Sequence, residues 1–168
     1  MPKTPEEWLQ EVAPDKARGI FKLFLGYAPV VGKTYSMLSE AIRRASRGED
    51  VVVGAVESHG RKVTAELATK LERVPPRNLE YKGTIFEEMD VDAILARKPA
   101  VAVVDELAHT NIEGSKHAKR YEDVIELLEA KIDVLSAMNV QHVESLGPTV
   151  QQITGVLVRE TEIGRAHV

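Results

Sequence analysis

Three consecutive residues, Gly32-Lys33-Thr34, have the types that bind the phosphates of a nucleotide. A glycine lets backbone N–H groups approach an anion, a lysine adds a full positive charge, and a threonine hydroxyl can ligate Mg²⁺. The apolar run Ile20–Leu25 and a short turn precede them, and a helical pattern starts directly afterwards. A strand, a turn and a helix N-terminus in this order predict a phosphate-binding loop.

The turn departs from the usual form of such a loop. Gly26 and Gly32 enclose five residues instead of four, and Tyr27 stands at the first glycine position of the strict register. Val30 fills a position that is usually small, and a β-branched residue disfavours the positive φ angles that help a loop wrap around phosphate. Because Gly-Lys-Thr alone is common by chance, the prediction needs a second, independent feature.

That feature is the apolar run Val101–Val104, which leads directly into Asp105 and Glu106. A buried strand that ends in aspartate places the carboxylate at the edge of the sheet where the phosphate loop also lies. There Asp105 can hold Mg²⁺ opposite Thr34. The following glutamate suits a general base that orients an attacking water, so Glu106 is the candidate catalytic residue.

Polar residues also follow the other predicted strands. In an open parallel sheet, ligands bind outside the carboxyl ends of the strands, so we expect these residues to converge on one rim. Asn139 or Gln141 could sense a γ-phosphate or position a water. Turns also favour such residues as helix caps, so a purely structural role stays open for each one. The rim candidates are Glu57, His59, His109, Thr110, Asn111, Asn139, Gln141 and His142.

The predicted nucleotide site combines these features. Its Mg²⁺ ligands are Thr34 and Asp105. Its nucleotide-binding residues are Pro29, Val30, Val31, Gly32, Lys33, Thr34, Tyr35, Asp105 and Asn139. Two other sites are weaker hypotheses: a metal bound by His59, His109 and His142, and a phosphate clamp or an arginine supplied in trans from the basic segment 114–120.

Strand and helix patterns alternate along the chain, and this order predicts an α/β fold with a parallel sheet covered by helices on both faces, like that of P-loop NTPases. The predicted strands are 20–25, 51–56, 79–82, 101–104, 132–140 and 156–158. The predicted helices are 35–47, 63–71, 86–97, 121–128 and 148–153. We expect a helix and linker over 1–19, one nucleotide-binding domain over 20–162, and a tail over 163–168.

Composition narrows the class of protein. With 168 residues, 29% charged and 43% hydrophobic, the chain is an ordinary globular domain. A net charge of −4 argues against a nucleic-acid binder, and the absence of cysteine excludes disulfides and thiolate metal sites. No apolar run approaches a membrane span and no signal peptide is visible, so we predict a cytoplasmic location.

Several longer motifs then resemble one family, the N-terminal cytoplasmic domain of the KdpD potassium-responsive sensor histidine kinases. They are Gly26-Tyr-Ala-Pro-Val-Val-Gly-Lys-Thr34, the stretch Val51 to Arg61, Val104-Asp-Glu-Leu-Ala-His-Thr-Asn111 and Asn139-Val-Gln-His-Val-Glu-Ser145, with support from Glu87 to Arg97 and Gln152-Ile-Thr-Gly155. They occur in the family's order over about residues 18–160.

The resemblance implies an ATP- and Mg²⁺-binding domain that tunes a kinase/phosphatase balance. Its partners would be other domains of the kinase or a cognate kinase in trans, and full-length relatives would tie it to the membrane. No kinase core is present here, so we expect an excised domain or a stand-alone homologue, with its oligomeric state open. Two alternatives remain, a slow Mg-dependent ATPase or phosphotransferase and an interaction module with a degenerate loop.

Overall fold

A six-stranded parallel sheet forms the centre of the computed structural model, which describes residues 17–26, 32–57, 62–143, 146 and 155–159. The strand order is β3-β2-β6-β7-β1-β8, and all neighbouring strands are parallel. The strands are β1 (Phe21–Gly26), β2 (Val51–Ala55), β3 (Glu72–Arg73), β6 (Val101–Val104), β7 (Asp133–Asn139) and β8 (Gly155–Arg159).

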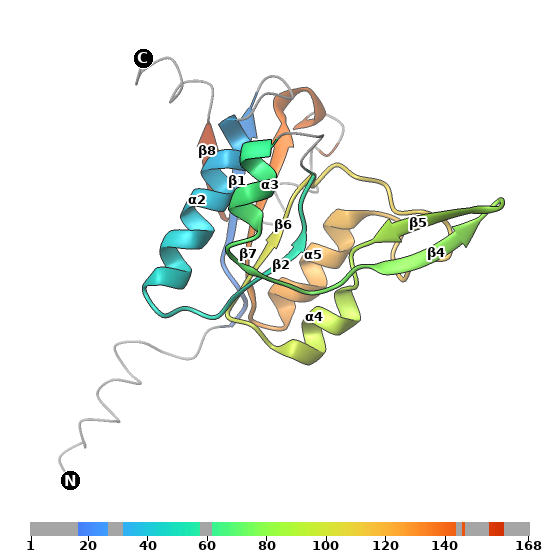
Figure 1. Ribbon diagram of the computed structural model, residues 1–168, viewed down its shortest axis with the longest axis horizontal. Helices are drawn as coiled ribbons and strands as arrows, with labels where there is room; N and C mark the ends of the chain where they lie inside the picture. Colours follow the sequence, from blue (N-terminus) through green and yellow to red (C-terminus); the bar gives the residue numbers. More distant parts are fainter. Residues whose placement is uncertain (1–16, 27–31, 58–61, 144–145, 147–154, 160–168) are drawn as a thin grey trace, which may run out of the picture.

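Helices cover both faces of this sheet (Figure 1). On one face, α2 (Gly32–Ser46) and α3 (Lys62–Ala68) pack in one apolar cluster, and on the other, α4 (Val91–Arg97) and α5 (Arg120–Glu129) pack in a second. Successive residues of a strand point to opposite faces, and the strands supply both clusters alternately. The predicted three-layer α/β fold is therefore confirmed.

Strand β7 lies between β1 and β6, although it comes last of the three in the sequence. The register pairs Gly26 at the end of β1 with Asn139 at the end of β7. On the other side, Val104 at the end of β6 pairs with Ser136, whose hydroxyl donates to the Val104 carbonyl. The carboxyl ends of β1, β7 and β6, followed by the Gly-Lys-Thr turn, Val140 and Asp105, thus lie at one edge.

An antiparallel hairpin, β4 (Arg77–Tyr81) and β5 (Thr84–Glu88), interrupts the alternation of strands and helices and extends from the body (Figure 1). The predicted helix 86–97 is therefore wrong in its first part. Lys82 and Gly83 both have positive φ, 52° and 79°, which is the geometry of a tight hairpin turn. The helix begins only after Asp90, whose carboxylate accepts a hydrogen bond from the Ala93 N–H as its N-cap.

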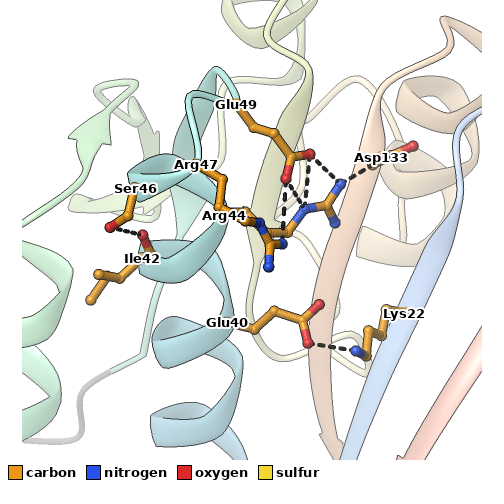
Figure 2. A network of polar contacts seen from close by, with 8 residues as sticks. All are labelled: Lys22, Glu40, Ile42, Arg44, Ser46, Arg47, Glu49 and Asp133. Atoms are coloured by element: carbon orange, nitrogen blue, oxygen red, sulfur yellow. Dashed lines mark hydrogen bonds and ion pairs between the residues drawn. The ribbon is translucent and has the colours of Figure 1, made fainter.

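At the amino ends of the strands, opposite the end just described, polar contacts join α2 to β1 and β7 (Figure 2). Arg44 donates through Nε and Nη2 to Glu49, at 2.8 to 3.1 Å, and through Nη2 to Asp133 at 2.9 Å. Asp133 in turn accepts the Ile20 N–H. Lys22 of β1 forms an ion pair with Glu40 of α2. These contacts fix α2, and with it the residues at its N-terminus.

Some predicted elements lie wholly or mostly outside the described residues: positions 1–16 of the helix and linker predicted over 1–19, the helix 148–153 and the tail 163–168. Within the described part, no helix has the length and apolar character that a membrane span requires.

Gly19 precedes β1 at a point where the main chain passes very close to a neighbour. A Cβ at this position would lie 1.9 Å from the carbonyl oxygen of Ile132, and the Gly19 N–H already donates to Leu128. We expect Gly19→Ala to lower the free energy of unfolding by about 2 to 4 kcal/mol, because backbone must move. At Gly54 a Cβ would meet only the end of the Ile94 side chain and Met89.

Gly54→Ala is therefore the matched control, with an expected loss of about 1 kcal/mol. Urea unfolding of both variants tests the difference. Equal losses in the two variants would show that the close approach at Gly19 is not a packing constraint.

Candidate functional site

Lys33, in the first turn of helix α2, lies across the last residue of β1. Lys33 is 2% exposed, and a Cβ on Gly26 would stand 3.2 Å from the Lys33 Cδ and 3.3 Å from its Cβ. A side chain at Gly26 would thus press on the lysine. This contact gives Gly26 a physical role even though it stands one residue further from Gly32 than the strict spacing requires. It also holds the lysine stem at the sheet edge.

Asp105 lies beside this turn, at the end of β6, and is fully buried. Its Oδ2 is 3.4 Å from the Oγ1 of Thr34 and accepts the Glu57 N–H at 3.0 Å. Its Oδ1 accepts the Glu106 N–H at 2.9 Å. The structure therefore brings Thr34 and Asp105 together, with backbone donors from two loops orienting the carboxylate.

Burial makes the charged form of this carboxylate costly. It raises the pKa of Asp105 to about 6, and the nearby charge of Glu106 adds to the effect. The two backbone hydrogen bonds and the positive charge of Lys33 act in the opposite direction but do not cancel it. A buried carboxylate in this situation is stabilised by a cation that replaces the lost solvation.

The donor set fits Mg²⁺, which prefers oxygen ligands such as carboxylates and hydroxyls. Adjacent oxygens of an octahedral Mg²⁺ stand about 2.9 Å apart. The Thr34 and Asp105 oxygens, which are 3.4 Å apart, would approach each other slightly to hold the ion. The ion would supply positive charge for phosphate oxygens, while Thr34 and Asp105 would hold it.

Asn139 lies between these two parts of the site, since β7 separates β1 from β6. Its Oδ1 is buried and has no hydrogen-bond partner among the described residues. A buried acceptor without a donor is costly, so this oxygen is suited to a donor that a ligand or its water shell brings.

Glu106 adopts a left-handed backbone conformation with φ of 54°. This region is unfavourable for a residue with a Cβ, at a cost of about 1 to 2 kcal/mol. The turn lets the next residue, Leu107, enter the core completely and donate its N–H to the Ala137 carbonyl. The positive φ angle of the candidate catalytic residue could not be predicted from the sequence, because neither aspartate nor glutamate at these positions indicates a left-handed backbone conformation.

Glu57, one of the rim candidates, lies close to both Asp105 and Arg120. Its backbone binds Asp105, and its carboxylate lies 4.0 Å from Arg120 with a side chain 41% exposed. Glu57, two residues after the end of β2, thus contacts Asp105 through its backbone, as Glu106 does from the other side. The strand order, which puts β2 next to β6, could not be read from the motifs alone.

The other rim candidates have different partners. His109 contacts Glu88 at 2.7 Å, and Asn111 donates to the His117 carbonyl and to Asp123. Thr110 accepts from the Lys119 ammonium. Gln141 and His142 lie on the short helix after β7 (Val140–His142). His109, Thr110 and Asn111 therefore have partners within the chain, and the convergence of all eight residues on one rim stays a prediction.

No group of three potential metal-ligating residues occurs in the part of the chain that the structure describes, so the three-histidine site gains no support there. His59 lies outside the described residues, as do three predicted nucleotide-binding residues, Pro29, Val30 and Val31. Tyr35, which was predicted with them, is 44% exposed on the first turn of α2.

The basic segment 114–120 is largely neutralised within the chain. Lys116 forms ion pairs of 2.7 Å with Asp92 and Glu126, and His117 contacts Glu126 at 2.8 Å. Arg120 is not a free surface arginine, because it is 2% exposed and donates to the carbonyl of Asp105 at 2.8 Å. These contacts do not favour the phosphate clamp or the arginine acting in trans.

The buried carboxylate makes a test on the ligand-free protein possible. The pKa of Asp105 lies near 6 in the folded chain against 3.8 ordinarily, so its contribution to stability is present at low pH and is lost as pH rises through about 6. We expect the stability of Asp105→Asn relative to wild type to rise by about 2 kcal/mol between about pH 4.5 and 7.5 in EDTA. Urea unfolding at several pH values measures this. A pH-independent difference would contradict the buried charge.

With this geometry established, the chain can be compared with known proteins. The family model "Osmosensitive K+ channel His kinase sensor domain", KdpD, matches residues 17–163. The sensor protein KdpD of Mycobacterium tuberculosis is 53% identical over 94% of this chain, and a putative sensor protein KdpD of Synechocystis is 53% identical over 88%. The chain spans only 18% and 40% of these two relatives.

A solved structure, the flagellar accessory protein FlaH of Methanocaldococcus jannaschii, aligns with a TM-score of 0.51 over 94% of this chain and 78% of that one, at 8% sequence identity. This likeness concerns the fold alone. The family match over most of the chain, together with about half of all residues identical in the relatives, identifies the chain as a member of the KdpD sensor-domain family of two-component sensor kinases.

Proposed function

We propose that this domain binds Mg-ATP and thereby regulates the sensor kinase to which such domains belong. The observation that carries the proposal is the 3.4 Å approach of the Thr34 hydroxyl to the buried Asp105 carboxylate, next to a lysine lying on Gly26. A hydroxyl, a carboxylate and a lysine at the N-terminus of a helix are the parts that phosphate and its cation require.

Each residue has a definite role in this proposal. Lys33 contacts the β- and γ-phosphates, and the amide of Gly32 approaches them without a side chain in the way. Thr34 and Asp105 hold Mg²⁺, and the Asn139 amide group binds the γ-phosphate or a water beside it. Pro29, Val30, Val31 and Tyr35 complete the nucleotide-binding surface.

The regulatory part of the proposal follows from chain length. Since this chain covers only 18% of the M. tuberculosis relative, the rest of such a kinase, in cis or in trans, is the proposed partner. Loops after β2, β6 and β7 meet at the site and would report its occupancy. Because ATP with Mg²⁺ is an intracellular ligand, we place the domain on the cytoplasmic side.

Isothermal titration with Mg-ATP tests the binding. We expect wild type to bind and Lys33→Ala to bind at least about a hundredfold more weakly, because it loses a buried charge aimed at phosphate. Lys62→Ala, which removes a lysine at the start of α3, is the matched control and should bind like wild type. Absence of binding by wild type would instead favour an interaction module with a degenerate loop.

Slow hydrolysis of ATP is a second candidate, favoured by two glutamates, Glu57 and Glu106, whose backbone N–H groups both donate to Asp105. A general base contributes about 10²- to 10⁴-fold to such a rate. If the domain hydrolyses ATP, we expect either Glu106→Gln or Glu57→Gln to lower phosphate release by about a hundredfold or more while Mg-ATP binding persists. Equal rates in wild type and both variants would remove hydrolysis by these residues.

A further inference from the structure

Arg120 is a buried arginine that the protein leaves incompletely paired. It is 2% exposed, and its guanidinium makes one close hydrogen bond to the described residues, from Nη1 to the backbone carbonyl of Asp105 at 2.8 Å. Its Nη2 is 3.7 Å from the Glu88 Oε1, and its Nη1 is 4.0 Å from the Glu57 Oε1. Its Nε, also buried, has no hydrogen-bond partner within the described residues.

Arg44, one of the two arginines in Figure 2, provides a contrast. Arg44 donates from both Nε and Nη2 to two carboxylates within 3.1 Å, at the far edge of the sheet. That arrangement accounts for a structural arginine. Burial of the Arg120 guanidinium costs several kcal/mol of desolvation. The contacts around Arg120 offset less of this cost than the contacts around Arg44 do. Packing alone therefore does not explain why an arginine occupies this position.

Glu88 connects this arginine to the hairpin. It is the last residue of β5 and is 6% exposed. Besides its approach to Arg120, its Oε1 contacts His109 at 2.7 Å, and its Oε2 accepts the Ile112 N–H at 2.6 Å. Two charged side chains thus link the hairpin root, the loop after β6 and the backbone of the residue proposed to hold Mg²⁺.

We propose that Arg120 and Glu88 form a positioning pair that fixes Asp105 for Mg²⁺ and couples its occupancy to the β4–β5 hairpin. This inference rests on the proposed nucleotide binding. Arg120 acts through the carbonyl of Asp105 and does not touch the ligand. When a cation binds the Asp105 carboxylate, the position or mobility of the Asp105 peptide group, which Arg120 contacts, changes. Because Arg120 also contacts Glu88, this change alters the end of the hairpin.

The test compares ATP binding with and without the metal. We expect Arg120→Met to weaken Mg-ATP binding by about tenfold or more, while binding of ATP in EDTA, which depends on Lys33, changes by less than about twofold. Arg120→Lys, which keeps the charge and one donor, should recover part of the loss. Arg44→Met is the matched control, and we expect it to lower stability without altering the ratio of the two affinities.

A double-mutant cycle with Glu88→Gln tests the pairing. If the two residues act as one unit, the double variant loses no more Mg-ATP affinity than Arg120→Met alone. In wild type, Mg-ATP should slow hydrogen exchange of the Ile112 amide and the hairpin, whereas ATP in EDTA should not. The exchange measurement needs no variant, so misfolding of a variant does not remove the test.

Three outcomes are decisive. If wild type does not bind Mg-ATP, the proposed function fails and this inference fails with it. If wild type binds while Arg120→Met retains its Mg-dependence, or if the hairpin exchanges equally with and without the metal complex, only the positioning pair is overturned. A loss that is equal for ATP with and without Mg²⁺ would likewise show that Arg120 supports the fold alone.

Discussion

The burial of one carboxylate, that of Asp105, is the constraint on which the site depends. A fully buried aspartate needs either a proton or compensating charge and donors, and the chain supplies donors from the loops after β2 and β6. Lys33 adds positive charge, and Arg120 binds the backbone of the same residue. These groups come from distant parts of the sequence, so the carboxylate is where the fold and the proposed chemistry meet.

The order of the strands explains how these groups come together. Placing β7 between β1 and β6 separates the end of β1 from Asp105 by one strand, and Asn139 lies at the end of that strand. Helix α2, held at its far end by Arg44, carries Thr34 across to the carboxylate. A parallel sheet brings all its carboxyl ends to one edge, which is why loops from four parts of the chain can share a ligand.

The sequence was sufficient for the core and for the juxtaposition of Thr34 with Asp105, because uninterrupted apolar runs such as Val101–Val104 specify buried strands. The sequence was insufficient where the residues have only a weak preference for one secondary structure. The hairpin has a Lys82-Gly83 turn, a poorer signal than Asn-Gly, and its strands are mostly exposed. Arg120 is buried because it contacts Glu88 and Asp105. These contacts join distant parts of the chain, so the periodicity of a helix or strand does not predict them.

The pairing of β1 also has a consequence for how the protein is made. Its neighbours are β7 and β8, so Phe21 pairs with Val134 and Gly155, residues that leave the ribosome more than a hundred positions later. Strand β1 is thus synthesised before both of its neighbours and can enter the sheet only after β7 has been made. Until then the apolar side chains of β1 are not packed between neighbouring strands. Contacts between residues so far apart in the sequence also form slowly. The amino end of α2 is therefore not held at the edge of the sheet until β7 has been synthesised.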